Sequence, residues 1–312
     1  MIFAVLFLAA AGKSAADPRE AAVGSAIARA SAWLDGVQVA PFLYGATSFR
    51  LFAMEIEARH RLWLAARGES SRKSELDQQI RGRLAQALDA EKLREVLTGE
   101  DGALCFTEMA VLAKRCRDHG LDPAPFGSAL DANLDRLRAD VDRLPPSLQV
   151  LHAVYLPAAG IDLGLDAAQL RRKGMIAGRP AEADLTLAEI YYLTHEIFAH
   201  TDYGALPLTG FSEGEERFLS RALSFFAIVY GSVNNLDILS EILICMASAG
   251  LADGWAYEEG IRVLVERQNQ DGSFGGPDPR SLGRPLLPTD FLHATMNGLG
   301  CLLLDSAGRR GP

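Results

Sequence analysis

Apolar residues recur at intervals of three and four positions along most of the chain, whereas the strict alternation of apolar and polar residues that is typical of strands is hard to find. This pattern predicts about twelve helices, punctuated by glycine and proline. The predicted helices cover residues 18–35, 45–67, 72–98, 103–119, 125–143, 146–158, 166–174, 186–203, 213–233, 235–250, 254–269 and 289–306. The sequence therefore indicates an all-α protein.

Several predicted helix ends carry recognisable chemistry. Thr186 with Glu189, and Ser212 with Glu215, have the spacing of a capping box, in which each side chain binds a backbone N–H at the start of a helix. Helices are expected to stop at four glycines: Gly120, Gly160, Gly204 and Gly250.

The helices are joined by short loops, and no charge run or Ser/Gly linker divides the chain. We therefore expect residues 18–312 to form a single domain, an α/α toroid of about six helical hairpins closed into a ring. In such a ring alternate helices form an inner layer. Helices of one layer are parallel and present the same ends to the same rim.

Residues 1–17 stand apart from this domain. The apolar run over residues 2–11 has the length of a signal-peptide core and is too short to span a bilayer, but no positively charged segment precedes it. We interpret residues 1–17 as a signal or an N-terminal extension, and with so weak a signal we expect a cytoplasmic protein.

Composition narrows the class of partners. The chain has 312 residues and a formal net charge of −9, which argues against a nucleic-acid-binding surface. No stretch of eighteen consecutive apolar residues indicates a membrane-spanning helix. The four cysteines contain no C-x-x-C pair, which excludes a disulfide framework and a four-cysteine zinc site.

Two motifs near the end of the chain suggest a relationship. The segment QNQDGSFGG contains Gln268, Gly272 and Phe274, and about fifteen residues later the segment DFLHAT contains Asp290 and His293. A glutamine amide can bind backbone groups at a helix end, glycine allows a tight reversal, and an aromatic ring can pack between hairpins.

The first segment resembles the Q-x3-G-x-W/F repeat of triterpene cyclases and of protein prenyltransferase β subunits. The second resembles the D-[FY]-x-H-x-T motif of those β subunits. The resemblance implies an α/α toroid, and it implies a zinc-ligand role for His293. It covers about the last fifth of the chain.

The departures from these families are also informative. The chain contains neither the D-x-D-D motif nor the D-D-x-x-D motif with which terpene cyclases start their reactions. Prenyltransferases place an Asp-x-Cys pair some sixty residues before the histidine, and here Asp237 has that place but Leu239 replaces the cysteine. We expect a divergent bacterial branch of the superfamily that is put to another use.

Ionisable residues inside three strongly apolar segments are the best candidates for chemistry. They lie in the eighth, tenth and twelfth predicted helices, which share one layer of the expected ring and would face one cavity. Asp237 and Glu241 are four residues apart and share a helix face. Asp290, His293 and Asn297 form a second stripe. His195 and Asp202 are seven residues apart and form a third, whereas His200 faces elsewhere.

We hypothesise a mononuclear centre for a divalent metal, Zn²⁺, Fe²⁺ or Mn²⁺, held by His195, Asp237, Glu241 and His293. His195 and Asp202 are the candidate catalytic residues. His195 lies several ångströms deeper in its predicted helix than Asp237 and His293 do in theirs, which requires either a later helix start or a deeper position for His195.

Simpler interpretations remain open. Asp237 and Asp290 could merely cap their helices, and His195 could be a core histidine with a backbone partner. His60, His119 and His152 are interpreted as surface or structural residues. Glu241 is harder to assign a structural role, because it is surrounded by Leu and Ile and a buried carboxylate needs a partner.

The function expected from these residues is that of a metal-dependent or acid/base enzyme. It would act on a hydrophobic or peptide-like small molecule, in bacterial secondary metabolism. One alternative is a toroid that binds a lipid or isoprenoid without catalysis. Another is a glycosidase-like α/α barrel, in which two carboxylates flank a sugar.

Overall fold

The computed structural model describes residues 17–66, 68–99, 101–276 and 286–309, and it contains no strand among them. The α-helices are α1 (Pro18–Asp35), α2 (Gly45–Ala65), α3 (Ser70–Leu84), α4 (Ala90–Thr98), α5 (Phe106–Asp118), α6 (Ala124–Asp131), α7 (Leu134–Asp142), α8 (Pro146–Tyr155), α9 (Ala167–Lys173), α10 (Met175–Gly178), α11 (Leu187–Thr201), α12 (Glu213–Ser232), α13 (Leu236–Ser248), α14 (Trp255–Glu266) and α15 (Leu292–Arg309). The predicted all-α class is confirmed. None of the described helices is both long and apolar enough to cross a membrane.

Most predicted helices are present, but two of them are divided. The helix predicted over 72–98 breaks after the short 3-10 segment Ala85–Ala87, and Asp89 caps the new helix α4 by accepting hydrogen bonds from two backbone N–H groups. The helix predicted over 125–143 divides into α6 and α7. Of the segment 1–17, only Asp17 lies among the described residues, and it caps α1.

All but one of the predicted helix ends with recognisable chemistry are confirmed. Both capping boxes are formed, at the start of α11 and at the start of α12. The backbone has positive φ at each of the four glycines that were expected to end helices, Gly120, Gly160, Gly204 and Gly250. Positive φ is a conformation that glycine adopts without steric cost, so Gly120, Gly160 and Gly250 stop their helices. Helix α11 already ends at Thr201, with Asp202 as its C-cap, before Gly204 is reached.

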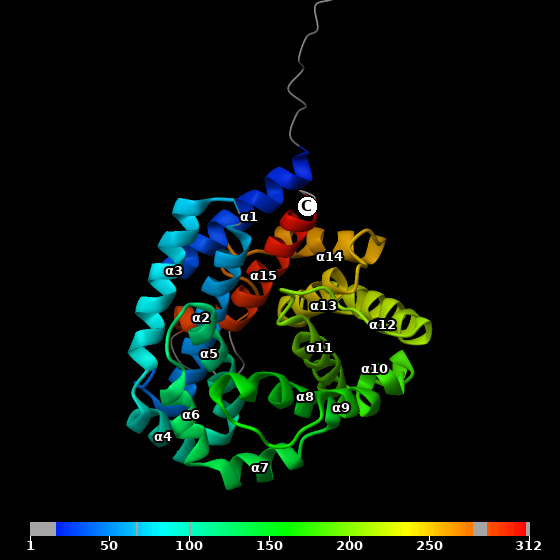
Figure 1. The fold of residues 1–312 in the computed structure, drawn as a ribbon. Coiled ribbons are helices and arrows are strands. Elements are labelled where there is room, and N and C mark those ends of the chain that lie inside the picture. Colours follow the sequence, from blue (N-terminus) through cyan, green and yellow to red (C-terminus); the bar gives the residue numbers. More distant parts are fainter. Residues whose placement is uncertain (1–16, 67, 100, 277–285, 310–312) are drawn as a thin grey trace, which may run out of the picture.

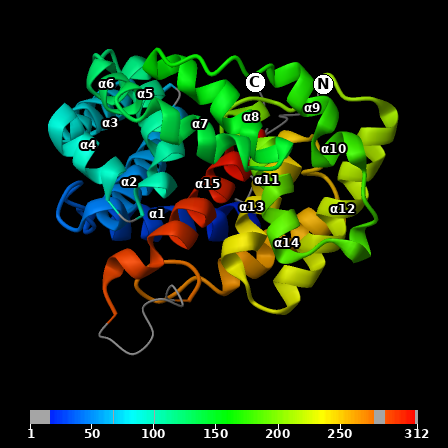
Figure 2. The ribbon, with the colours of Figure 1, turned by 90° about the horizontal axis from the view of Figure 1, so that it is seen from below.

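Six helices contact one another in a closed series. Helix α2 contacts α5, α5 contacts α8, α8 contacts α11, α11 contacts α13, α13 contacts α15, and α15 contacts α2 again. The helices follow one another around the molecule in the order of the sequence, as the colours in Figure 1 show. Figure 2 shows the same arrangement from below. We call these six the inner helices. The arrangement is compatible with the expected α/α toroid.

Ion pairs between neighbouring inner helices show that these helices run in the same direction. Near the start of α2, Arg50 binds Glu108 near the start of α5. Further along both helices, Glu57 of α2 binds Arg115 of α5. Contacts among α11, α13 and α15, described below, follow the same order. The inner helices therefore present their N-terminal ends at one end of the molecule and their C-terminal ends at the other.

The glutamine motif joins the last part of the chain to the first. The Gln268 side-chain amide donates hydrogen bonds to the carbonyl oxygens of Ala26 in α1 and of Gly272. Gly272 has φ +95°, and a Cβ at this position would lie 2.4 Å from a backbone oxygen of α1. The Phe274 ring is fully buried, and the Phe274 N–H donates to Thr295 of α15. The motif thus acts as the sequence suggested, by reversing the chain and packing an aromatic ring against neighbouring helices.

A buried carboxylate links α11 to the short helix α10. The Glu196 side chain is fully buried, and its Oε2 accepts a hydrogen bond of 2.7 Å from the Met175 N–H. Gly174 lies so close that a Cβ there would be 2.3 Å from a Glu196 oxygen. Burial raises the pKa of Glu196 to about 7, although hydrogen bonds from Ser147 and from the backbone oppose the shift.

Candidate metal centre

Helix α13 carries two of the predicted carboxylates. Its N-cap is Asn235, whose side chain accepts a hydrogen bond from the Ile238 N–H. Asp237 is therefore not the cap of this helix and can interact with neighbouring helices. Glu241 follows one turn later on the same face, and its side chain is only 1% exposed.

Helix α15 carries the predicted histidine. The 3-10 turn Pro288–Phe291 precedes it, and Asp290 in this turn accepts a 2.7 Å hydrogen bond from the Leu287 N–H. The N-cap of this turn is Leu287, so Asp290 is not the N-cap that one of its two interpretations expected, although its side chain binds the N-cap backbone from within the turn. His293 lies in the first turn of α15, and Asn297 lies one turn later on the same face.

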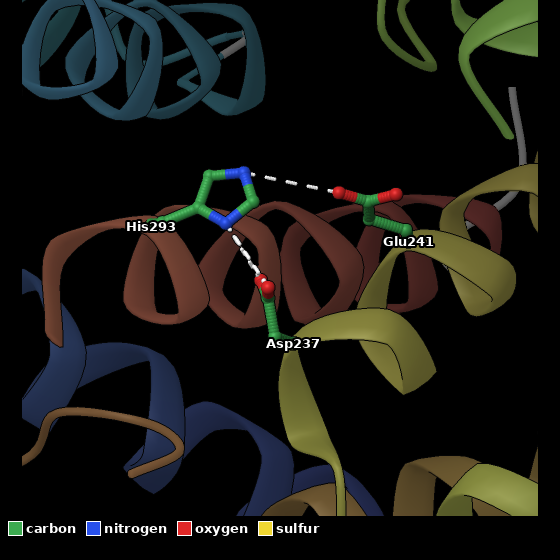
Figure 3. A group of neighbouring side chains, drawn as sticks. All are labelled: Asp237, Glu241 and His293. Atoms are coloured by element: carbon green, nitrogen blue, oxygen red, sulfur yellow. Dashed lines mark hydrogen bonds and ion pairs between the residues drawn. The ribbon is translucent and has the colours of Figure 1, made fainter. Parts of the chain in front are cut away.

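The two helices bring three candidate ligands together. His293 Nδ1 lies 2.9 Å from Asp237 Oδ1, and His293 Nε2 lies 3.8 Å from Glu241 Oε1. Figure 3 shows the imidazole between the two carboxylates. One ligand atom from each of the three residues lies within 4.8 Å of the others. We call Asp237, Glu241 and His293 the candidate centre.

Three further side chains hold the carboxylates in place. The Asn297 amide donates to Asp237 Oδ1 at 3.2 Å and to Glu241 Oε1 at 3.3 Å. From α11, the Thr194 hydroxyl donates to Glu241 Oε2 at 2.8 Å, and the Tyr191 hydroxyl is 3.4 Å from Asp237 Oδ2. Such supporting hydrogen bonds fix the orientation of ligands before a metal binds. Asn297 was noted from its spacing, whereas Thr194 and Tyr191 were missed.

The electrostatics of the candidate centre are strongly perturbed. Burial would raise the pKa of Asp237, but the His293 imidazole and the hydrogen bonds from His293, Asn297 and Tyr191 outweigh it and lower that pKa. Burial would lower the pKa of His293, but the two carboxylates raise it to about 8. Burial raises the pKa of Glu241, with Asp237 adding to the shift. Two carboxylates and one imidazolium leave a net negative charge when all are ionised.

The centre is open on one side. The side chains of His293 and Asp237 are 38% and 26% exposed, whereas Glu241 is buried beneath them. Asp237 and His293 lie in the first turns of their helices. The site therefore opens at the N-terminal ends of the inner helices.

His195 borders the candidate centre but is not among the three converging ligands. His195 is the ninth residue of α11. Its neighbour Thr194 donates a hydrogen bond to Glu241, so this part of α11 lies at the height of Glu241 rather than of Asp237. Its Nδ1 donates to the Tyr191 carbonyl oxygen at 2.8 Å, so Nε2 is the acceptor nitrogen. Of the two explanations for the depth mismatch, the deeper position of His195 is correct.

Asp202 does not lie beside His195, contrary to the prediction. Helix α11 ends at Thr201, and Asp202 has φ +50°, which takes it off the helical face it was expected to share. Its carboxylate accepts hydrogen bonds from Arg115 and from the Tyr155 hydroxyl, and it pairs with Lys114. Burial opposes its ionisation, but Arg115 and Lys114 hold its pKa well below the usual range.

The three histidines interpreted as surface or structural are all buried. His60 Nδ1 lies 3.0 Å from His119 Nε2, and His119 Nδ1 lies 2.7 Å from Asp77. His152 is buried on α8. These residues are far apart in the sequence and have no shared spacing, so no local pattern could have revealed the His60–His119–Asp77 chain.

Comparison with known proteins places the chain in a family. A family model described as a domain of unknown function, DUF6895, matches residues 52–287. The chain belongs to this family. The match includes Asp237 and Glu241 and ends before His293. No curated protein and no solved structure matches the chain.

Proposed function

We propose that the protein is an enzyme whose candidate centre binds one divalent cation, Zn²⁺, Fe²⁺ or Mn²⁺. The observation that carries the proposal is the convergence of ligand atoms from Asp237, Glu241 and His293 within 4.8 Å. Carboxylate oxygens and an imidazole nitrogen are suitable donors for these ions. A cation there would supply Lewis-acid activation of water or of a substrate carbonyl.

The charge balance favours a cation. Glu241 is almost fully buried and shares its surroundings with a second carboxylate, so its ionisation is unfavourable without a nearby positive charge. In the described structure His195 and His293 oppose the rise of the Glu241 pKa, and His293 Nε2 lies 3.8 Å from Glu241 Oε1. A divalent cation would replace the proton of His293 and leave both carboxylates ionised.

We assign the general base to His195. Its hydrogen bond to the Tyr191 carbonyl oxygen fixes the tautomer and leaves Nε2 free to accept a proton. Thr194 and Asn297 would orient Glu241, and neither would take part in the chemistry. Asp202 has no place in this proposal, because Arg115 and Lys114 bind it away from the candidate centre.

An apolar rim supports a hydrophobic or peptide-like substrate. Large apolar side chains are exposed at or just before the starts of inner helices, at the end of the molecule where the candidate centre opens. They are Leu43, Tyr44, Leu104, Leu187, Val233, Leu286 and Leu287. Exposed apolar groups that gather around a polar site are typical of a surface that binds an apolar ligand.

We also propose a relationship to the toroid superfamily of terpenoid cyclases and protein prenyltransferase β subunits. The closed series of inner helices and the geometry of Gln268, Gly272 and Phe274 support it. The divergent residues described above indicate a different reaction.

Metal analysis tests the centre directly. Untagged protein purified without chelators is analysed for bound metals, and chelator-treated protein is titrated calorimetrically with Zn²⁺, Mn²⁺ and, without oxygen, Fe²⁺. We expect one site per chain, and we expect it to be lost in His293→Ala and Glu241→Gln. His200→Ala, which removes an imidazole outside the centre, should bind metal as the wild type does. Substoichiometric metal that His293→Ala leaves unchanged would refute the proposal.

A second experiment separates catalysis from binding. A bacterial small-molecule extract is incubated with wild-type protein or with Glu241→Gln and is compared by mass spectrometry. Compounds consumed by the wild type alone support an enzyme. Compounds that copurify with both proteins and are never converted support the alternative, a toroid that binds a lipid or isoprenoid.

A further inference from the structure

A pocket of about 550 Å³ lies at the other end of the inner helices. It is lined by the C-terminal parts of α2 and α15, by the segment that follows α11, and by residues of α1, α3 and α5. No residue of the candidate centre lines it. The proposal for this pocket therefore does not depend on the metal proposal.

The pocket is lined by an arginine whose hydrogen-bonding capacity is only partly used. Arg61 of α2 is 7% exposed, and its Nη1 donates to the Met296 carbonyl oxygen at 3.2 Å. Its Nε and Nη2 are buried and have no hydrogen-bond partner among the described residues. These two nitrogens form the side edge of the guanidinium, which binds the two oxygens of a carboxylate in parallel. A buried donor without a partner is costly, so an incoming oxyanion would gain from both.

Two of the carboxylates that line the pocket, those of Glu57 and Asp202, are bound to another arginine. Both oxygens of Glu57 bind Arg115, at 2.5 and 2.9 Å, and Arg115 also binds Asp202. His60, which also lines the pocket, is neutral, because burial and the charge of Arg115 lower its pKa to about 2. Arg61 is thus the cation in this wall that lacks a bound carboxylate.

The position of Arg61 depends on a glycine. A Cβ at Gly300 of α15 would lie 2.1 Å from Arg61 Nη1 and 2.8 Å from its Cδ. The Arg61 side chain can therefore pack against α15 at this point only because residue 300 has no Cβ. On another side, the Tyr203 ring centroid lies 5.9 Å from Arg61 Cζ. These contacts hold the guanidinium in place before any ligand arrives, which reduces the entropic cost of binding.

The other residues that line the pocket indicate the charge of the anion and the character of the rest of the molecule. Apolar side chains from four helices line the pocket, among them Ile27, Leu76, Leu303 and Leu304. Glu57, Glu69 and Asp202 also line it, and their charges disfavour an anion with more than one negative charge. We propose that this pocket binds a small monocarboxylic acid with an apolar body, whose carboxylate pairs with Nε and Nη2 of Arg61. Because both nitrogens are buried, the carboxylate reaches them after a local shift of the pocket wall, to which Tyr203 belongs.

Calorimetric titration with hexanoate, octanoate and phenylacetate tests the proposal. Hexanol, octanol and phenylethanol are the neutral comparisons, and hexyl phosphate and phenyl phosphate are the anions of higher charge. We expect at least one acid to bind at least about tenfold more tightly than its alcohol and its phosphate, because charge-assisted hydrogen bonds are strong. Binding should persist with chelator, so failure of the metal proposal would leave this result intact.

Variants locate the binding. Arg61→Met and Gly300→Ala should each weaken binding of the acid by at least about tenfold, and Arg61→Lys, which keeps the charge without the side edge, should also weaken it. Arg72→Met is the matched control: Arg72 lines the same pocket but pairs with Glu75, and its loss should change affinity by less than about twofold. Circular dichroism and thermal melts confirm that each variant is folded.

Three outcomes would overturn the proposal. In the first, no acid binds more tightly than its alcohol. In the second, folded Arg61→Met binds the acids as the wild type does. In the third, Arg72→Met weakens binding as much as Arg61→Met, which would show a general effect of charge rather than a site on Arg61.

Discussion

The pH dependence of stability should reveal the buried carboxyl group of Glu196. Its pKa is about 7 in the folded protein, against an ordinary value of 4.5. Between these values the folded state binds a proton that the unfolded state has released, so stability falls as pH rises through this range. Below pH 4.5 both states are protonated, and the stabilising contribution is fully present.

The size of the effect follows from the shift. A shift from 4.5 to about 7 corresponds to about 3 to 4 kcal/mol in all, at roughly 1.4 kcal/mol per pH unit. Glu196→Gln removes the titration but keeps an oxygen that can accept from the Met175 N–H. The free energy of unfolding of this variant, relative to wild type, should therefore rise by about 3 kcal/mol between pH 4.5 and about pH 8.

Chemical denaturation of both proteins at a series of pH values measures this difference. Other titrating groups are common to both proteins and cancel. Glu213→Gln is the control for loss of a carboxylate, because the Glu213 side chain is 82% exposed. A difference between Glu196→Gln and wild type that stays constant within about 1 kcal/mol across the range would refute the reasoning.

Three further predictions concern the centre, the closing motif and the buried ion pairs. Metal affinity at the candidate centre should rise with pH and level off above about 8, because a metal competes with the proton of His293; calorimetry at several pH values checks this. Gly272→Ala should destabilise the fold by at least about 1 kcal/mol, through its positive φ and its contact with α1, whereas Gly276→Ala, which has open space, should not; thermal melts compare them. Arg115→Leu should cost about 3–5 kcal/mol in chemical denaturation, because it leaves the Asp202 carboxylate without its buried partner.

Much of the fold could be predicted because local chemistry set it. The capping pairs and the helix-ending glycines Gly120, Gly160 and Gly250 act through the neighbouring backbone, so their positions in the sequence are sufficient. The break before α4 was missed because residues 85–88 read AQAL, all good helix formers, and only Asp89 marks the new start. The division of the helix predicted over 125–143 into α6 and α7 was also missed.

The candidate centre was predictable only within each helix. The spacings of Asp237 with Glu241 and of His293 with Asn297 place each pair on one face. Which residue of α11 meets them depends on how far that helix is displaced along its axis. Packing decides that displacement, so Thr194 reaches Glu241 while His195 turns to the backbone of Tyr191.

The shared direction of the inner helices gives the two ends of the molecule opposite electrical character. Each helix carries a partial charge of about +0.5 elementary charge at its N-terminus and about −0.5 at its C-terminus. The effect of these partial charges fades within about one turn. Asp237 therefore lies in a field that favours a carboxylate, whereas Arg61, near the end of α2, lies in one that favours a cation. A divalent cation at the first end must be held against that field, which the paired carboxylates of the candidate centre can do.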